Sequence, residues 1–299
     1  MTDYGQPLRF GIFPTPDADS AQQVLAVVET ADRDGLDLVG VQDHPYQSRH
    51  LDTFTLMAFL LARTQRIQVF PDVANLPLRP PAVLAKAAAG LGLLSGGRFQ
   101  LGLGAGGFNE AVQAMGGPAR NPREAAEALE EAIDVIRLMW SGQRSVRYDG
   151  SHYQLAGVHP GPAPTPAPGI WLGVRGPRLL RALGRKADGW VPSSSYVPPS
   201  DLPEMQRRID DSAQQAGRDP REIRRVYNVF GTITTDGSSS GAFSGPVDQW
   251  VEELTDLVIE YGMDTFVFGA PADDPVQLRR WAREVVPAVR ESVERHRGN

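Results

Sequence analysis

The chain has 299 residues, of which 41% are hydrophobic and 22% charged, and its 30 basic and 36 acidic side chains leave a formal net charge of −6. This is the composition of a globular protein, and its acidic balance argues against a nucleic-acid-binding protein. The absence of cysteine excludes disulfides, thiolate nucleophiles and cysteine-ligated metal sites.

Short apolar segments rich in valine, isoleucine and phenylalanine alternate along the chain with longer segments of helical periodicity. The predicted strands cover residues 9–14, 38–44, 67–73, 99–104, 170–174, 189–193, 223–231 and 265–269. The predicted helices cover residues 20–34, 53–63, 81–94, 123–140, 177–186, 202–217, 247–261 and 275–295. This alternation predicts an α/β fold, a (β/α)8 TIM barrel that forms a single domain over residues 1–299.

The interval between the fourth and fifth strands is longer than the others. It contains a long predicted helix and then a proline-rich stretch, residues 145–168, with a turn signal at Tyr148-Asp149-Gly150. We interpret it as an excursion between strands 4 and 5 that leaves the barrel and returns. A second irregular stretch, residues 235–245, is rich in glycine and serine and predicts a mobile loop.

No targeting or membrane segment is visible in the sequence. The first residues contain neither the basic nor the apolar region of a secretory signal. The longest strongly apolar run, residues 54–62, is far shorter than the roughly 20 residues that a membrane span needs. We therefore expect a cytoplasmic protein with no membrane contact.

The carboxyl ends of barrel strands usually carry the active site. Those positions in this chain are rich in glycine and apolar residues, which favours a flat heteroaromatic ligand over a metal-bound anion. We expect Phe13, Tyr46, Trp171, Tyr196 and Phe230 to shape the pocket.

Asp43 and His44 end the second predicted strand. A histidine beside an aspartate can transfer a proton or bond a cofactor, because imidazole titrates near neutral pH. The alternative is a pair that only satisfies the backbone of the loop. No metal site is expected, because His44 and His50 do not share a helical face and no third ligand is apparent.

Three further motifs can each be interpreted as a functional site or as a feature without that function. Residues 102–107 match G-x-G-x-x-G, but the following segment is broken at residues 116–118, which favours close backbone approach to a ring or phosphate over a dinucleotide-binding turn. Residues 237–241 match G-x-S-x-G inside a loop, which we interpret as chance. Arg175 and Arg178 flank a predicted helix start, which is typical either of an anion site or of a plain turn.

Met57, Phe59, Met139 and Trp140 are predicted to lie in the core.

Five ordered motifs together resemble the bacterial luciferase-like superfamily of flavin- and deazaflavin-dependent oxidoreductases. They are residues 41–45 (VQDHP), 75–83 (NLPLRPPAV), 94–106 (LSGGRFQLGLGAG), 173–177 (GVRGP) and 187–190 (ADGW). The resemblance implies a TIM barrel, often a homodimer, with a flavin-type ring at the carboxyl ends of the strands. It also implies a non-proline cis peptide bond under the ring, which matches Asp72–Val73.

The resemblance implies roles for individual residues as well. His44 is the expected catalytic proton donor or acceptor. The expected cofactor-binding residues are Asp43, Asp72, Val73, Asn75, Ala105, Gly106 and Asn109, with Arg175 and Gly176 in a phosphate loop.

The pair Asp43-His44 resembles relatives that use the deazaflavin F420, whereas many relatives that use reduced FMN have Glu-His there. We therefore expect hydride transfer between F420 and a small organic substrate. Related sugar-phosphate dehydrogenases carry an acid where this chain has Gly107, which argues against a sugar phosphate. One alternative is a two-component monooxygenase that receives reduced FMN from a separate flavin reductase. Another is a non-catalytic flavin-binding protein.

Overall fold

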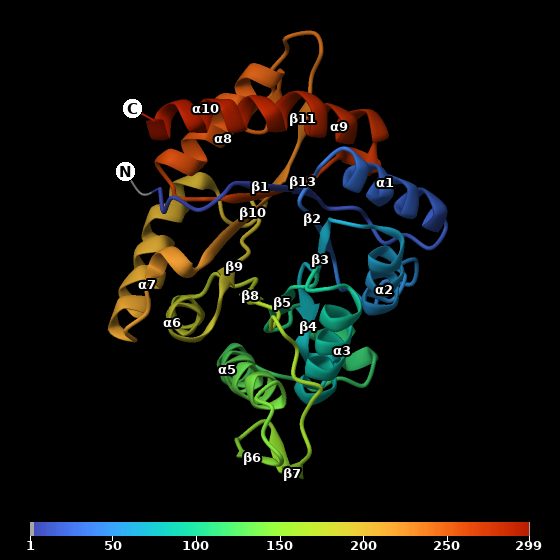
Figure 1. The fold of residues 1–299 in the computed structure, drawn as a ribbon, viewed down its shortest axis with the longest axis vertical. Coiled ribbons are helices and arrows are strands. Elements are labelled where there is room, and N and C mark those ends of the chain that lie inside the picture. Colours follow the sequence, from blue (N-terminus) through green and yellow to red (C-terminus); the bar gives the residue numbers. More distant parts are fainter. Residues whose placement is uncertain (1–2, 299) are drawn as a thin grey trace.

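Parallel strands from the whole length of the chain close into one barrel, and helices form a layer around it (Figure 1). The computed structural model describes residues 3–298. The strands of the barrel, in the order in which they pair, are β3 (Gln68–Pro71), β2 (Leu38–Val41), β1 (Arg9–Ile12), β13 (Thr265–Gly269), β10 (Arg224–Phe230), β9 (Gly189–Trp190), β8 (Ile170–Leu172), β5 (Leu101–Gly104) and β4 (Ala74–Asn75). The predicted TIM barrel is confirmed.

The third strand predicted from the sequence is split into β3 and β4. The first half pairs with β2, and the second half pairs with β5, so that this one segment closes the barrel. The peptide bond between Asp72 and Val73, at the split, is cis, as the family resemblance implies.

With β3 and β4 taken as the two halves of one split strand, each barrel strand is followed by a helix of the outer layer. These helices are α1 (Ala21–Arg33), α2 (Thr53–Arg63), α3 (Pro81–Leu94), α5 (Pro122–Met139), α6 (Pro177–Lys186), α7 (Leu202–Gln215), α8 (Val247–Ile259) and the final pair α9 (Pro275–Arg280) and α10 (Val286–Gly298). All the predicted strand–helix pairs are therefore confirmed. None of the helices within residues 3–298 combines the length and the apolarity needed to cross a membrane.

One predicted core residue is not in the core. The side chain of Phe59 is 55% exposed, whereas Met57, Met139 and Trp140 are buried as predicted. The helical period explains the difference, because the buried residues of α2 include Leu56 and Leu60, and Phe59 falls outside that face.

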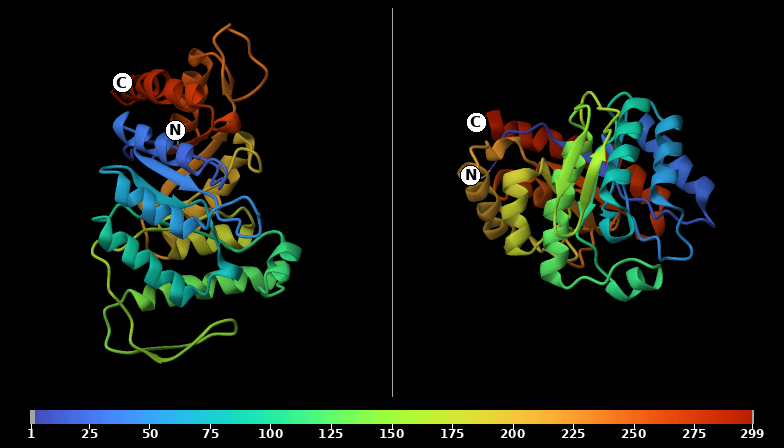
Figure 2. Two further views of the ribbon diagram at one scale, coloured as in Figure 1. Left: turned by 90° about the vertical axis from the view of Figure 1, so that its right-hand side faces the viewer. Right: turned by 90° about the horizontal axis from the view of Figure 1, so that it is seen from below.

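The excursion between the fourth and fifth barrel strands is confirmed. It contains the short helix α4 (Asn109–Ala114), then α5, and then an antiparallel hairpin of β6 (Val146–Asp149) and β7 (Gln154–Val158) that lies outside the barrel against α5 (Figure 2). The carboxylate of Glu131 in α5 fixes the hairpin turn by accepting hydrogen bonds from the backbone N–H groups of Ser151, His152 and Tyr153, at 2.9 to 3.1 Å. The loop around residue 240 is bordered by β11 (Thr232–Ile233) and β12 (Ser244–Gly245), which pair with each other.

The interior of the barrel is a packed apolar layer. It consists of Leu38, Phe70, Trp171, Val191, Val226 and Val267, and Phe13 and Val73 pack against it from the carboxyl ends of β1 and β3. The prediction that Trp171 shapes the pocket is wrong, because its ring lies in this layer with its centroid 5.1 Å from that of Phe70. The strand that carries Trp171 points it inward, below the mouth of the barrel.

Candidate active site

The segment Asp72–Val73 forms the floor of the barrel mouth. A Cβ atom on Gly104 or Gly173 would come within 2.8 or 2.9 Å of Val73 Cγ2, and a Cβ atom on Gly40 would come within 2.7 Å of Asp72 Oδ2. These glycines lie on or directly after three different barrel strands, β5, β8 and β2. Their missing side chains make the room that the floor occupies.

Asp72 is joined across the barrel to Asn228 of β10. The Asn228 Nδ2 atom donates to Asp72 Oδ1 at 3.1 Å, while Asp72 Oδ2 and Asn228 Oδ1 are shielded from solvent and have no hydrogen-bond partner among the described residues. Burial raises the pKa of Asp72 to about 7, and the hydrogen bond from Asn228 opposes this only partly. The floor therefore contains a carboxyl group that changes charge near neutral pH.

Asp43 follows β2 and forms a buried ion pair with Arg79. Arg79 Nε and Nη2 donate to the two Asp43 oxygens at 2.6 and 2.7 Å, and the backbone N–H of Asn75 donates to Oδ2 at 2.8 Å. Burial acts to lower the pKa of Arg79, but the carboxylates of Asp43 and Asp52 outweigh it and raise that pKa. The Asp43 side chain has no exposed surface, so it can act on a ligand through the groups that it holds.

His44 lies beside Asp43 and is held by Tyr46. The Tyr46 hydroxyl is 2.6 Å from His44 Nδ1, and the ring of Phe108 packs edge-on at 5.8 Å. Burial and the charge of His50 lower the pKa of His44, and Asp43 opposes them. Burial and Asp43 raise the pKa of Tyr46 to about 12. At neutral pH the pair is thus a neutral imidazole and a neutral phenol, which leaves His44 Nε2 for proton transfer.

The loop after β5 brings backbone close to the mouth. Gly106 has a φ of +93°, and a Cβ atom there would overlap the side chain of Pro77, so only glycine fits. Ala105 is half-buried against the core. Asn109 begins α4 and donates from its side chain to the Arg120 carbonyl at 3.0 Å, which joins the two ends of the α4 segment.

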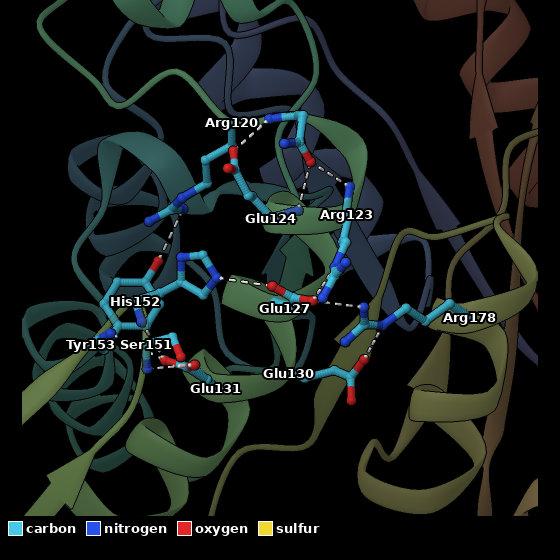
Figure 3. A network of polar contacts seen from close by, with 11 residues as sticks. Arg120, Arg123, Glu124, Glu127, Glu130, Glu131, Ser151, His152, Tyr153 and Arg178 are labelled. Atoms are coloured by element: carbon cyan, nitrogen blue, oxygen red, sulfur yellow. Dashed lines mark hydrogen bonds and ion pairs between the residues drawn. The ribbon is translucent and has the colours of Figure 1, made fainter.

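Arg175 and Gly176 lie at the start of α6. Gly176 is the residue that precedes the first turn, and the exposed Arg175 guanidinium lies 5.7 Å from the centre of the Tyr196 ring. Arg178 does not add free charge there, because its guanidinium bonds Glu130 at 2.8 Å and Glu127 at 3.2 Å on α5 (Figure 3). That part of the predicted anion site is wrong, since two carboxylates neutralise the Arg178 side chain.

From the sequence, Asn228 was placed at one of the strand ends where the site was expected but was given no role, and neither Arg79 nor Asp52 was placed in the site. Arg79 belongs to one of the motifs that carry the family resemblance, but only the structure shows that it pairs with Asp43. Asn228 could have been found, because it follows the inward-facing Val226 at the period of a strand and is a polar residue on an apolar face. Within residues 3–298, no three His, Asp or Glu side chains come together as metal ligands.

The sequence resembles those of known proteins over nearly its whole length. Residues 5–239 match the family model described as luciferase-like monooxygenase. The chain is 30% identical to the F420-dependent glucose-6-phosphate dehydrogenase of Kineococcus radiotolerans, over 96% of this chain and 98% of the relative.

Two solved structures share the architecture. An F420-dependent secondary alcohol dehydrogenase in complex with an F420-acetone adduct superimposes with a TM-score of 0.83 at 18% identity, over 95% of this chain and 99% of that one. A riboflavin lyase with modified FMN superimposes with a TM-score of 0.81 at 15% identity, over 96% of this chain and 92% of that one. At these identities the likeness concerns the fold alone.

Proposed function

The chain belongs to the luciferase-like monooxygenase family, and on that basis we propose that it is an F420-dependent oxidoreductase that exchanges a hydride with a small organic substrate. The F420-dependent relative that aligns with nearly the whole chain supports this choice of cofactor. The observation that carries the proposal is the neutral His44, held by Tyr46 at the carboxyl ends of the strands with Nε2 left for a substrate.

The residues of the mouth fit a planar cofactor with polar edges. Gly107 and Gly176 have open space where a Cβ atom would lie, so a ligand can approach the backbone after β5 and before α6. Asn75 offers a buried side-chain oxygen, Oδ1, that has no partner among residues 3–298. The start of α6, with Arg175, suits a phosphate group because free N–H groups and the helix dipole favour an anion.

The deazaflavin, when bound, supplies the ring carbon that accepts or releases hydride. The chain's own residues position the reactants and move the proton. His44 Nε2 takes the hydroxyl proton of an alcohol, or returns it to a carbonyl in the reverse direction. Asp43 acts as a positioning residue through Arg79 and the backbone of Asn75. The Asp72–Val73 segment covers the apolar interior of the barrel and would form the inner wall of the cofactor site.

We propose that the substrate is uncharged. The aromatic side chains Phe13 and Phe230 pack edge to face at 5.4 Å after β1 and at the end of β10. Phe108 and Tyr196 are exposed in the loops that follow β5 and β9. The family resemblance implies that sugar-phosphate dehydrogenases carry an acid at the position of Gly107, and this chain has no side chain there. An apolar rim of this kind selects by shape and apolar contact rather than by charge.

The proposal is tested by anaerobic incubation of the protein with F420 and a panel of small alcohols, followed through the cofactor absorbance. We expect reduction of F420 by a subset of the alcohols, with no requirement for oxygen. The second candidate function is a two-component monooxygenase, and the observation that favours it is the match to a family described as luciferase-like monooxygenase. It would instead consume oxygen in strict dependence on reduced FMN supplied by a flavin reductase.

A further inference from the structure

We propose that the Asp72 carboxyl group, held by Asn228 in the floor of the mouth, binds its proton more tightly when the bound cofactor is reduced than when the cofactor is oxidised. This inference rests on the proposed function. It assigns to Asp72 an electrostatic role in the redox equilibrium of the cofactor, separate from the proton transfer by His44.

The position of Asp72 carries the first step. Its side chain sits in the floor, against Gly40 of β2, and is tied by a 3.1 Å hydrogen bond to Asn228 of β10. The floor covers the apolar interior layer, in which Phe70 and Trp171 lie. A ring lying on this floor would therefore have a carboxyl group on its inner side, whose Oδ2 atom is shielded from solvent by the protein.

The second step is that, within residues 3–298, no cationic side chain pairs with Asp72. Burial raises its pKa, the Asn228 amide is the one group that opposes this, and no charged side chain contributes. The titratable groups on the adjoining strand ends are Asp43, which Arg79 neutralises, His44 after β2 and Arg175 after β8. None of them bonds Asp72 in the described structure, and Oδ2 has no partner at all.

The third step is the charge balance of hydride transfer. A hydride carries one proton and two electrons, so the ring becomes more negative by one charge when it accepts hydride from the substrate. A carboxylate beneath the ring in a medium of low dielectric constant opposes that change, whereas a carboxylic acid does not. Reduction of the cofactor therefore raises the pKa of Asp72 and shifts its carboxyl group towards the protonated form, and oxidation shifts it back. By reciprocity, ionisation of Asp72 weakens the binding of reduced cofactor relative to oxidised cofactor.

The test compares the dissociation constants of oxidised and reduced F420 between pH 6 and pH 9, by tryptophan quenching under anaerobic conditions. The preference for reduced cofactor is the dissociation constant of oxidised F420 divided by that of reduced F420. For the native protein we expect this ratio to fall about tenfold between pH 6 and pH 9, which corresponds to a difference of one unit between the pKa of Asp72 with reduced and with oxidised cofactor bound. In Asp72→Asn the preference should follow the titration of the free cofactor alone. The matched control is Asp273→Asn, which neutralises another carboxyl whose pKa burial raises, outside the floor. It should keep the native pH dependence.

A second readout needs no cofactor. Infrared spectroscopy of the apoprotein should show the C=O band of a protonated carboxylic acid that disappears as the pH rises through neutrality and that is missing in Asp72→Asn. The absence of that band, or cofactor binding whose redox preference has the same pH dependence in the native and Asp72→Asn proteins, would overturn the inference. If the band titrates but neither F420 nor FMN binds, the proposed function fails and the redox coupling fails with it.

Discussion

The Tyr46 hydroxyl and His44 Nδ1 are 2.6 Å apart, and this single contact determines which nitrogen of the imidazole can meet a substrate. Because the phenol occupies Nδ1, the proton-transfer chemistry that we propose falls to Nε2. The contact also orients the ring next to Phe108, whose side chain is 65% exposed and within reach of a ligand.

Replacement of His44 tests this assignment. We expect His44→Ala to lower turnover by about 10²- to 10⁴-fold, the usual contribution of a positioned acid or base, with little change in the affinity for oxidised cofactor or in thermal stability. The control is His159→Ala, an exposed histidine of the excursion. Turnover of His44→Ala at the native rate would remove His44 from the mechanism.

The pH dependence of alcohol oxidation tests the electrostatics of the same residue. As a base, His44 must be neutral, and burial and the charge of His50 lower its pKa below the ordinary value of 6.5. The neutral form therefore persists below pH 6.5, and kcat/KM should begin to fall only at more acidic pH. The profile is best recorded in the Asp72→Asn background, so that Asp72 does not contribute a second titration. A midpoint at or above pH 6.5 would disagree with the structure.

The ion pair between Arg79 and Asp43 should be essential to stability. Arg79→Met leaves a buried carboxylate without its cation, which typically costs about 3–5 kcal/mol in the free energy of unfolding. Arg49→Gln, which breaks the exposed pair with Asp17, should cost about 0–1 kcal/mol. Chemical denaturation of the two variants measures the difference, and equal losses would show that Asp43 does not depend on Arg79.

The glycines beneath the floor are tested by adding a methyl group. Gly173→Ala places Cβ about 2.9 Å from Val73 and should cost about 1–3 kcal/mol while weakening cofactor binding. Gly90→Ala in α3 is the control, because nothing lies within 4 Å of its added Cβ atom. That change should be neutral or slightly stabilising in a helix. Unchanged cofactor affinity in Gly173→Ala would mean that the cofactor does not rest on this floor.

The homodimer expected from the family resemblance stays a prediction. The neighbouring helices α2 and α3 expose large apolar side chains, Phe59 on α2 and Val83, Leu93 and Leu94 on α3, which makes this face the expected contact. Phe59→Glu should shift the sedimentation coefficient from dimer to monomer, whereas Val276→Glu, on the exposed side of α9, should not. A native protein that sediments as a monomer at micromolar concentration would refute the expectation.

The fold could be predicted from the sequence because apolar periodicity reports burial directly. The strand containing Val226 and the helix containing Leu56 and Leu60 are examples, and in each the buried face follows the period of the element. The split of the third strand was not predicted from the sequence, although Pro71 and Asp72 interrupt the apolar residues of the segment 67–73. Only the family resemblance indicated the cis bond at Asp72–Val73.

The candidate site could be predicted only in part, because pairing between distant residues is not a local property of the sequence. His44 and Asp43 were identified from their place at a strand end. The partners of Asp43 and Asp72, namely Arg79 and Asn228, are 36 and 156 residues away along the chain. For the same reason the sequence did not show that Arg178 is neutralised by carboxylates of α5.

Titration of the purified protein in parallel with F420 and with FMN, each oxidised and reduced, shows which cofactor the barrel binds. Trp171 packs on Phe70 in the layer beneath the floor, so quenching of tryptophan fluorescence reports occupation of the mouth. We expect tight binding of F420, clear preference for F420 over both forms of FMN, and weaker binding of F420 in Gly173→Ala. Binding of reduced FMN with no measurable binding of F420 would contradict this expectation and would identify the two-component monooxygenase instead.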